Sequence, residues 1–462
     1  MKMPLRLHDG LREGTASTRF LWGADGQVVL ADLERATSLD VSLAQLSGAS
    51  VLIATYDQLA NALALIELDG IVHRLITCSP DLPLEHVGSV VADGEVTAIV
   101  TDRDEIKHAG FDIPVVTSRG PQLTTREAVK LEPQPTEWVL LTSGTTGAPK
   151  MVRHTLAGLT GAIKTTSNLG TIWGTFYDIR RYGGLQVFFR SMLGGGSLVL
   201  SSVGEPVEDY LNRLAARRVT HVLGTPSHWR RALMSSAARK ISPRYVRLSG
   251  EIADQAILDA LRAFFPGAQI THAFASTESG VGFEVTDGRE GFPDSVLGVH
   301  GDVEIKVVNG SLMVRSPRTA SRYVGPERPQ LMDEDGFVDT GDIVERRGER
   351  WYFLGRKTGI INVGGLKVHP EEVEAVINRH RDVRMSLVRS RKNPITGALV
   401  VAEVVLKPDD KGRDSEQRAA QCKREILEIC QAELAPHKIP VSIRFVPSLD
   451  VAAAGKIARP HA

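Results

Sequence analysis

The chain has 462 residues, enough for roughly three folding units at about 150 residues per domain. Its 55 basic residues balance its 55 acidic residues, so no global charge favours nucleic acid or an anionic membrane surface. No run reaches the roughly 18 apolar residues of a membrane span, and the three cysteines lack metal-ligand spacing. We therefore expect a cytoplasmic protein with no membrane span and no nucleic-acid partner, of undetermined oligomeric state.

Up to about residue 280, short β-rich runs alternate with helical patterns. The first round contains "VLIATY" (51–56), "DQLANALALIEL" (57–68) and "VTAIVTD" (96–102). The second round contains "THVLGTP" (220–226) and "AILDALRAFFP" (256–266). This alternation predicts parallel α/β layers.

From about residue 301 the pattern changes to short strands separated by turn residues, which predicts a β-rich subdomain. After Gly355, two strand patterns and the helical "EQRAAQCKREILEICQAEL" predict a compact α+β unit. We therefore expect an α/β fold with two domains. The large N-terminal domain (1–355) would combine layered α/β subdomains with the β-rich subdomain, and a small, mobile α+β C-terminal domain (356–462) would follow.

The stretch "LLTSGTTGAPKMVRHT" (140–155) follows a predicted strand and is rich in Ser, Thr and Gly. Backbone N–H groups, hydroxyls and glycines that permit close approach suit a polyphosphate. The spacing lacks the Gly-Lys-Ser/Thr of a Walker loop, which disfavours a P-loop NTPase. An isolated stretch of this composition is more often an ordinary surface loop.

The order "TSGTTGAPKMV" resembles the phosphate loop of the adenylate-forming superfamily, which includes acyl-CoA synthetases, aryl-CoA ligases, nonribosomal adenylation domains and luciferases. Four further motifs follow in the family's order: "HAFASTESG" (272–280), "GFVDTGD" (336–342), "FLGRKTGIINVGGLKVHPEEVE" (353–374) and "AAGKIARP" (454–460). The resemblance implies that the loop binds the phosphates of ATP through Thr142, Ser143, Gly144, Thr145, Thr146, Gly147 and Lys150.

In "HAFASTESG" the resemblance implies that Phe274 lies against adenine, while Thr277 and Glu278 reach the phosphates and Mg²⁺. Phe274 stands where Tyr is usual and Ala275 where Gly is usual. The chemistry survives both changes, because a ring stacks without its hydroxyl and a carboxylate supplies a hard oxygen ligand. Taken alone, Glu278 would more often be a solvated loop carboxylate.

The next two motifs resemble the ribose-binding strand and the crossover between the two domains. They imply that Asp342 binds both ribose hydroxyls and that Arg356 contacts ribose or phosphate. A carboxylate accepts two hydrogen bonds, as a vicinal diol requires. Without its neighbours, Asp342 would be a turn aspartate.

The C-terminal motif implies that Lys456 enters the active site for the first half-reaction, where an ammonium stabilises developing negative charge. A lysine so close to a C-terminus is by itself more often part of a disordered tail. The crossover motif implies that the small domain then rotates and brings Gly364 and Gly365 beside pantetheine. Lys367 would face the phosphates in one state, and Thr358 occupies the hinge position where relatives carry Asp or Lys.

The acid would bind where relatives build their acyl pocket. Candidate lining residues, each of which equally fits core packing, are Tyr177, Tyr182, Ser249 and Gly250. Asp178 stands near the position where amino-acid-activating relatives pair with the substrate ammonium. Arg180 and Arg181 either neutralise Asp178 or bind a second carboxylate of the acid. A small aromatic or short-chain acid is the weak preference.

The resemblance implies ATP-dependent conversion of a carboxylic acid to acyl-AMP, with release of pyrophosphate, and then transfer to a thiol. No carrier domain follows Lys456, so the acceptor would come from outside, and coenzyme A and a separate carrier protein present the same pantetheine arm. The leading interpretation is an acid–CoA ligase using ATP and Mg²⁺. One alternative is a stand-alone adenylating enzyme that loads an amino, aryl or short acyl acid onto the phosphopantetheine of a separate carrier protein. A non-catalytic nucleotide-binding paralogue is the other.

Overall fold

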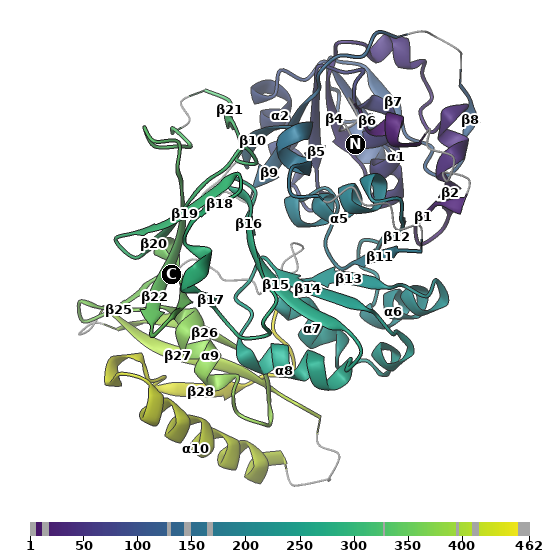
Figure 1. Cartoon of the computed structure of the whole chain (residues 1–462). Coiled ribbons are helices and arrows are strands. Elements are labelled where there is room, and N and C mark those ends of the chain that lie inside the picture. The colour runs from purple at the N-terminus through teal and green to yellow at the C-terminus, as the bar shows by residue number, and fades with distance from the viewer. Residues whose placement is uncertain are drawn as a thin grey trace.

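The computed structural model describes residues 6–11, 18–126, 131–142, 149–163, 170–326, 329–393, 397–408 and 415–450. Among them, two large sheets lie in the N-terminal part of the chain (Figure 1). The first has the order β21 (Arg322–Val324), β10 (Lys150–Thr155), β9 (Glu137–Thr142), β5 (Arg74–Cys78), β4 (Ser50–Ala54), β6 (Ala98–Thr101) and β7 (Val115–Thr117). The second has the order β16 (Gly280–Val285), β15 (Gln269–Ser276), β14 (Tyr245–Ser249), β13 (His221–Gly224), β11 (Ile172–Thr175), β12 (Ser197–Val199), β1 (Phe20–Trp22) and β2 (Gln27–Val29).

Helices cover both faces of these sheets. They are α1 (Gln58–Leu68), α2 (Leu84–Asp93), α3 (Asp104–Lys107), α4 (Leu156–Thr160), α5 (Tyr182–Leu193), α6 (Val207–Ala216), α7 (Pro226–Ala232) and α8 (Gln255–Phe264). One core cluster joins α1 and α5 to strands of both sheets, so these two helices form the layer between them. A second cluster packs α2 on the outer face of the first sheet, and a third packs α6, α7 and α8 on the outer face of the second. Every residue of α1 is buried, as a helix between two sheets requires.

The prediction of parallel layers is confirmed for most strands of both sheets. Strands β4, β5, β6 and β9 pair in parallel, as do β11, β13, β14 and β15. β9 turns directly into antiparallel β10, β15 turns directly into antiparallel β16, and β2 pairs antiparallel with β1, whereas the edge strand β7 pairs with β6 in parallel. Both sheets are therefore mixed. The β9–β10 hairpin and the β15–β16 hairpin each contain a predicted motif.

The predicted β-rich region forms a third sheet with its own apolar core. Its order is β17 (Phe292–Pro293), β23 (Arg350–Arg356), β22 (Val338–Arg347), β20 (Ser311–Arg315), β19 (Val303–Val308) and β18 (Gly298–His300). One strand of this region, β21, leaves it and pairs with β10 of the first sheet. Sequence patterns gave no sign of this exchange, because the partner strand lies about 170 residues earlier.

The C-terminal part is a small α+β unit, as predicted. A hairpin of β24 (Ile361–Val363) and β25 (Leu366–Val368) precedes α9 (Pro370–Ile377) and a sheet of β26 (Val383–Asn393), β27 (Gly397–Leu406) and β28 (Ser442–Phe445). Helix α10 (Ser415–Glu433) packs with α9 on this sheet around a separate core (Figure 1). The boundary at residues 355 and 356 stays a prediction.

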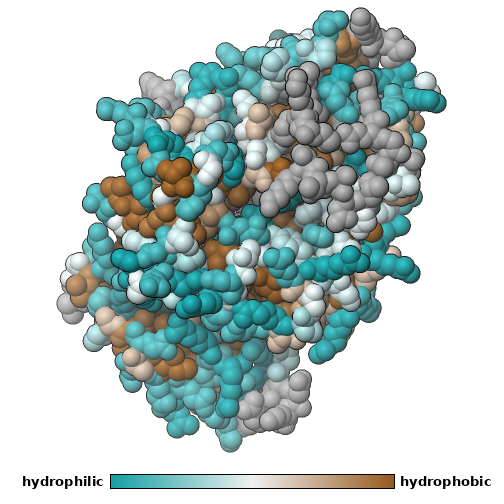
Figure 2. All heavy atoms as spheres, in the orientation of Figure 1, coloured by the Kyte–Doolittle hydropathy of each residue, from teal (hydrophilic) through white to brown (hydrophobic). Residues whose placement is uncertain are grey.

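The remaining elements are short. They are the two-stranded pair β3 (Ala36–Thr37) and β8 (Thr124–Thr125) and the 3₁₀ turns η1 (Leu7–Leu11), η3 (Leu30–Glu34), η4 (Leu43–Leu46), η5 (Ser236–Lys240), η6 (Asp294–Val296), η7 (Lys357–Gly359) and η8 (Pro436–Lys438). Within the described residues, no helix has the length and apolar character needed to cross a membrane. Figure 2 shows small apolar patches on one largely polar face, as expected where apolar residues fill internal cores.

A buried carboxylate ties three elements of the N-terminal part together. Asp69, which follows α1, accepts a hydrogen bond of 2.8 Å from the Leu7 backbone N–H and one of 3.1 Å from Trp138 Nε1. Burial raises the pKa of Asp69 to about 6 despite these two bonds. The folded state therefore holds the Asp69 proton more tightly than the unfolded chain does.

This difference predicts a pH dependence of stability. Between the unfolded pKa of about 4 and the folded pKa of about 6, the contribution of Asp69 to the free energy of unfolding falls as pH rises. Above that window the contribution is constant. The free energy of unfolding of wild type minus that of Asp69→Asn should decline by about 3 kcal/mol between pH 4 and 6. Urea titrations at several pH values measure this, with exposed Asp112→Asn as the control. A difference that does not vary with pH would contradict the assignment.

Candidate active site

The carboxyl ends of the parallel strands meet at one edge of the second sheet. Gly224 pairs with Leu248, and Ser249 pairs with Ala273, so β13, β14 and β15 end together. In open α/β sheets this edge is where ligands bind. The predicted acid-binding residues and the "HAFASTESG" turn both lie here.

The phosphate-loop motif forms a β-hairpin at the edge of the first sheet. Thr142 ends β9 and lies directly opposite Lys150, the first residue of β10. The Lys150 ammonium lies 5.6 Å from the ring centroid of Tyr323, a cation–π contact that holds the side chain in place. The predicted phosphate ligands Ser143, Gly144, Thr145, Thr146 and Gly147 lie outside the described residues.

The turn that carries Thr277 and Glu278 is held against this hairpin. The Ala320 backbone N–H donates a 2.9 Å hydrogen bond to the Glu278 carbonyl, and the Ser321 N–H donates a 2.8 Å bond to the Arg153 carbonyl of β10. Residues 320 and 321 thus bridge the two motifs. Burial and the Glu278 carboxylate both raise the pKa of Tyr323, which places Glu278 near the ring that Lys150 covers.

Asp342 and Arg356 face each other on β22 and β23. Arg356 Nε lies 3.1 Å from Asp342 Oδ1 in an ion pair, with 57% of the arginine side chain and 17% of the aspartate side chain exposed. Burial lowers the pKa of Arg356, but the carboxylates of Asp342, Glu278 and Glu371 outweigh this and raise it. Glu278 is therefore within electrostatic reach of Arg356.

Four of the predicted groups thus come together from parts of three sheets. Lys150 comes from the first sheet, Glu278 from a turn of the second, and Asp342 and Arg356 from the third. Sequence reasoning missed Tyr323, which joins Lys150 to Glu278. Its strand has no motif of its own, and only the pairing of Tyr323 with Val152 of β10 brings it here. The cluster combines two cations with two carboxylates, which suits a phosphorylated ligand and a divalent cation together.

Phe274 lies in β15 beside this cluster. Its ring stacks on Phe283 and on Phe353, with centroids 5.7 Å apart in both pairs. The ring is half-buried and packs against the core of the third sheet. These contacts orient Phe274 and leave part of its ring exposed.

Two of the candidate acid-binding residues contact each other. The buried Tyr177 hydroxyl donates a 2.8 Å hydrogen bond to the Ser249 carbonyl, next to Gly250, whose φ of 85° favours glycine. Tyr182, the first residue of α5, is also buried, and its ring centroid lies 6.0 Å from that of His154. Burial raises the pKa of both tyrosines, so their hydroxyls stay neutral.

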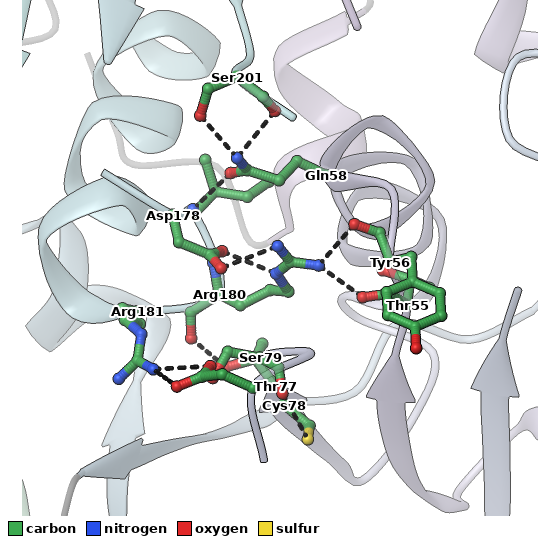
Figure 3. A network of polar contacts seen from close by, with 12 residues as sticks. Thr55, Tyr56, Gln58, Thr77, Cys78, Ser79, Asp178, Arg180, Arg181 and Ser201 are labelled. Atoms are coloured by element: carbon green, nitrogen blue, oxygen red, sulfur yellow. Dashed lines mark hydrogen bonds and ion pairs between the residues drawn. The ribbon is translucent and has the colours of Figure 1, made fainter. Parts of the chain in front are cut away.

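Asp178 is engaged by Arg180 (Figure 3). Arg180 Nε donates to Asp178 Oδ1 at 2.7 Å, and Arg180 Nη2 donates to Asp178 Oδ2 at 2.8 Å. Arg180 Nη1 also donates to the Tyr56 carbonyl at 3.0 Å, while Arg181 pairs with Asp81. Both Asp178 oxygens are thus taken by a fully buried guanidinium, which favours neutralisation over binding of a substrate ammonium.

The residues expected to act in the second half-reaction lie in the C-terminal part. Gly364 and Gly365 form the two-residue turn between β24 and β25, with φ of 59° and 87°, and a side chain at either would meet open space. The Gly365 N–H donates to Asn362 Oδ1 at 2.8 Å, which fixes the turn. Lys367 and the hinge residue Thr358 are exposed, and the structure does not bring either into the cluster. Lys456 lies outside the described residues.

The small part docks closely on the large part at the crossover. Gly355 has a φ of 144°, which favours glycine, and a Cβ there would lie 2.4 Å from Glu371 Oε2, so β23 and α9 approach each other closely. Asn378 Nδ2 donates to Asp254 Oδ2 at 3.3 Å, and Arg379 lies 3.8 Å from Glu290. These few polar contacts and one close approach fix the position of α9.

The chain belongs to the AMP-binding enzyme family: the family's main domain matches residues 45–324, and its C-terminal domain matches residues 372–456. This membership confirms the resemblance drawn from the five motifs.

Individual relatives are distant. The mitochondrial acyl-coenzyme A synthetase ACSM4 of Rattus norvegicus is 25% identical over 352 residues, which cover 70% of this chain and 59% of the rat protein. A 2-succinylbenzoate–CoA ligase of Bacillus cereus is 26% identical over 394 residues, covering 79% of this chain and 78% of that protein. The chain thus spans about three fifths of the length of the rat relative.

The fold matches solved structures along almost its whole length. The o-succinylbenzoate coenzyme A synthetase of Bacillus subtilis, solved in complex with ATP and a magnesium ion, superposes with a TM-score of 0.74. The two chains are 20% identical, and the match covers 98% of each. This similarity establishes the shared fold.

Asp178 has two candidate roles, as the ion-pair partner of Arg180 or as a ligand of a substrate ammonium, and stability measurements distinguish them. Asp178→Asn removes the carboxylate from a buried guanidinium and should lower the free energy of unfolding by about 3 kcal/mol, without changing which acids are activated. Asp81→Asn, which breaks the more exposed pair with Arg181, should cost less than about 1 kcal/mol. Urea denaturation and an acid panel measure both effects. An Asp178→Asn protein of normal stability with altered acid preference would instead indicate a substrate contact.

Proposed function

We propose that the protein is an AMP-forming acid–CoA ligase. The observation that carries the proposal is the convergence of Lys150, Glu278, Asp342 and Arg356 at the carboxyl edge of the second sheet. Membership of the AMP-binding enzyme family and relatives named as acyl-CoA synthetase and CoA ligase support it. The substrates would be ATP, a carboxylic acid and coenzyme A.

In this proposal each group of the cluster has a role in binding ATP. Lys150 and the loop from Thr142 to Gly147 bind the β- and γ-phosphates, and Phe274 borders adenine. Asp342, oriented by Arg356 at 3.1 Å, accepts hydrogen bonds from the ribose hydroxyls. Glu278 and Thr277 lie where the phosphates and a divalent cation would meet.

The residues present fit a magnesium ion. The Glu278 carboxylate offers a hard oxygen donor. Its negative charge is one of the causes that raise the pKa values of Tyr323 and Arg356. Bound Mg²⁺ would neutralise phosphate charge. Glu278 would hold it, and Lys150, which lies over the ring of Tyr323, would hold the phosphates.

The two half-reactions follow from this placement. A carboxylate oxygen attacks the α-phosphorus, the bond to the β-phosphate oxygen breaks, and pyrophosphate leaves, with Lys456 stabilising the transition state. The thiol of coenzyme A then attacks the acyl carbon, loses its proton and displaces AMP. For this second step the small domain would rotate about Thr358 and present Gly364 and Gly365 to pantetheine, with Lys367 beside the phosphates.

The location in the cell is part of the proposal. The three cysteines, Cys78, Cys422 and Cys430, are unpaired and buried, which supports a reducing compartment such as the cytoplasm. Carrier-protein loading is the alternative for the second half-reaction, because a carrier presents the same pantetheine arm as coenzyme A.

The direct test is acid-dependent release of pyrophosphate from ATP across aromatic, short-chain, long-chain and amino acids. We expect release with one acid class, stimulation by coenzyme A and formation of a thioester detected by mass spectrometry. Release without stimulation by coenzyme A would indicate a carrier protein as acceptor. ATP binding with no release for any acid would contradict the proposal and favour a non-catalytic paralogue.

The role of Lys456 separates the half-reactions. Lys456→Ala should lower the rate of acyl-AMP formation by about 10²- to 10³-fold, yet still convert supplied acyl-AMP and coenzyme A to thioester. Stopped-flow pyrophosphate release and thioester analysis measure the two steps. Lys423→Ala, on the exposed side of α10, is the matched control. Equal loss of both steps would contradict a lysine used only for adenylation.

A further inference from the structure

Three metal-ligating side chains of different chemistry lie together in the C-terminal part of the chain. They are His380 and Asp382, in the turn between α9 and β26, and Cys422 in α10. One ligand atom of each, a ring nitrogen, a carboxylate oxygen and the thiol sulfur, lies within 4.8 Å of the other two. His380 is 4% exposed and Cys422 is 2% exposed. Imidazole, carboxylate and thiolate are the three ligand types that Zn²⁺ takes in proteins.

The spacing of these atoms is close to that of a tetrahedral zinc site. Cys422 Sγ lies 3.8 Å from Asp382 Oδ2. A sulfur bound at about 2.3 Å and an oxygen bound at about 2.1 Å to one Zn²⁺ are roughly 3.6 Å apart at the tetrahedral angle. These two atoms are therefore already at coordination spacing. The histidine nitrogen has to move by about 1.5 Å or less to join them.

Glu425, one turn along α10 from Cys422, orients the imidazole. In the neutral ring, His380 Nδ1 accepts a 3.2 Å hydrogen bond from the Asp382 backbone N–H, so Nε2 carries the ring proton and donates it to Glu425 at 2.8 Å. Gln421 Nε2 donates to the other Glu425 oxygen at 2.7 Å. A carboxylate on the far nitrogen of a metal-binding histidine fixes the ring and raises its basicity. Nδ1 would bind the metal in place of its long bond to the backbone.

Two arginines lie near the Asp382 carboxylate and oppose a cation there. Arg418 Nη2 lies 3.8 Å from Asp382 Oδ1, and Arg381 Nε lies 3.9 Å from Oδ2, both longer than a hydrogen bond. Arg418 Nη2 instead donates to the Lys407 carbonyl at 2.8 Å, and Arg381 is largely exposed. The Cys422 thiolate and the two carboxylates of the cluster would balance the charges of Zn²⁺ and Arg418. The loaded site would therefore be close to neutral.

The cluster joins segments that are distant in the chain. Cys422 and Asp382 are 40 residues apart, which is why cysteine spacing in the sequence does not reveal the site. His380 directly follows Asn378 and Arg379, which contact the large part of the protein. An ion held by the turn and by α10 would tie this docking segment to the helix.

We propose that His380, Asp382 and Cys422 form a zinc site, with a water molecule as the fourth ligand and Glu425 as the partner that orients His380. Binding forms one Zn–N, one Zn–O and one Zn–S bond, and the thiol S–H bond breaks and releases its proton to solvent. The thiolate distinguishes this site from the magnesium site proposed at Glu278, because Mg²⁺ prefers oxygen ligands. The inference is independent of the proposed function, since none of these residues belongs to the ATP or acid site.

The first test is calorimetric titration of the full chain with Zn²⁺, in excess MgCl₂ and without ATP or acid. Wild type and Cys430→Ala should bind one more Zn²⁺ ion per chain than Cys422→Ala. Cys430 is the matched control, because it is also a buried, unpaired cysteine of α10. Glu425→Gln should keep the site and weaken its affinity by about 10- to 100-fold.

The second test uses Co²⁺ to detect the thiolate ligand directly. Wild type and Cys430→Ala should show the sulfur-to-metal charge-transfer absorption of a Co²⁺–thiolate bond, and Cys422→Ala should not. Zn²⁺ should also raise the Tm of wild type, and a chelator should reverse this, because an ion that binds only the folded state stabilises it. Circular dichroism checks the fold of each variant. Asp382→Asn, which keeps the thiol and the side-chain shape, should weaken binding even if Cys422→Ala folds poorly.

Two outcomes would overturn the inference. The first is equal Zn²⁺ binding by wild type and Cys422→Ala, or a wild type that shows no Co²⁺–thiolate absorption. The second is full affinity in both Asp382→Asn and His380→Gln. Either result would leave these side chains as a network of ion pairs and hydrogen bonds, and neither would affect the ligase proposal.

Discussion

The candidate active site depends on the connection between β10, β21 and the Glu278 turn. Val152 pairs with Tyr323, the Ser321 N–H bonds to the Arg153 carbonyl, and the Ala320 N–H bonds to the Glu278 carbonyl. This short backbone network joins a strand of the first sheet to a turn of the second. Because backbone groups must be paired when buried, the network sets the separation of Lys150 and Glu278 without using either side chain.

Charge balance organises the region around the acid pocket. At the carboxyl edge, Arg180 is satisfied by Asp178 and by the Tyr56 carbonyl, so neither charge remains for a ligand. At the amino edge, Arg190 lacks such a partner within the described residues. Two arginines on the same segment of chain therefore differ: Arg180 is paired with Asp178, whereas Arg190 Nε has no hydrogen-bond partner within the described residues.

Among the described residues, polar contacts of α9 and one close approach attach the small C-terminal unit to the large part. Gly355 lets β23 approach Glu371 closely, and Asp254 and Glu290 contact the end of α9. Such polar contacts are individually weak. An interface of this kind is consistent with the proposed rotation, since a large apolar interface would resist it. The exposed Gly364–Gly365 turn is the part of this unit best shaped for close approach to a ligand.

The sequence by itself determined the local elements and the family. The alternation of β-rich runs with helical patterns located α1, β4, β13 and α8, because each of them is a contiguous stretch with many apolar residues. The five motifs identified the family, and with it the candidate groups, because each motif is a contiguous stretch of chain.

Only the tertiary structure decided which groups meet. The contact of Tyr323 with Lys150 depends on residues from different motifs or from none. The ion pair of Asp178 with Arg180 depends on side-chain orientations that the sequence does not specify. Sequence periodicity reports burial along one element. Contacts between distant strands depend on sheet order and register, which arise when the sheets and helices pack together.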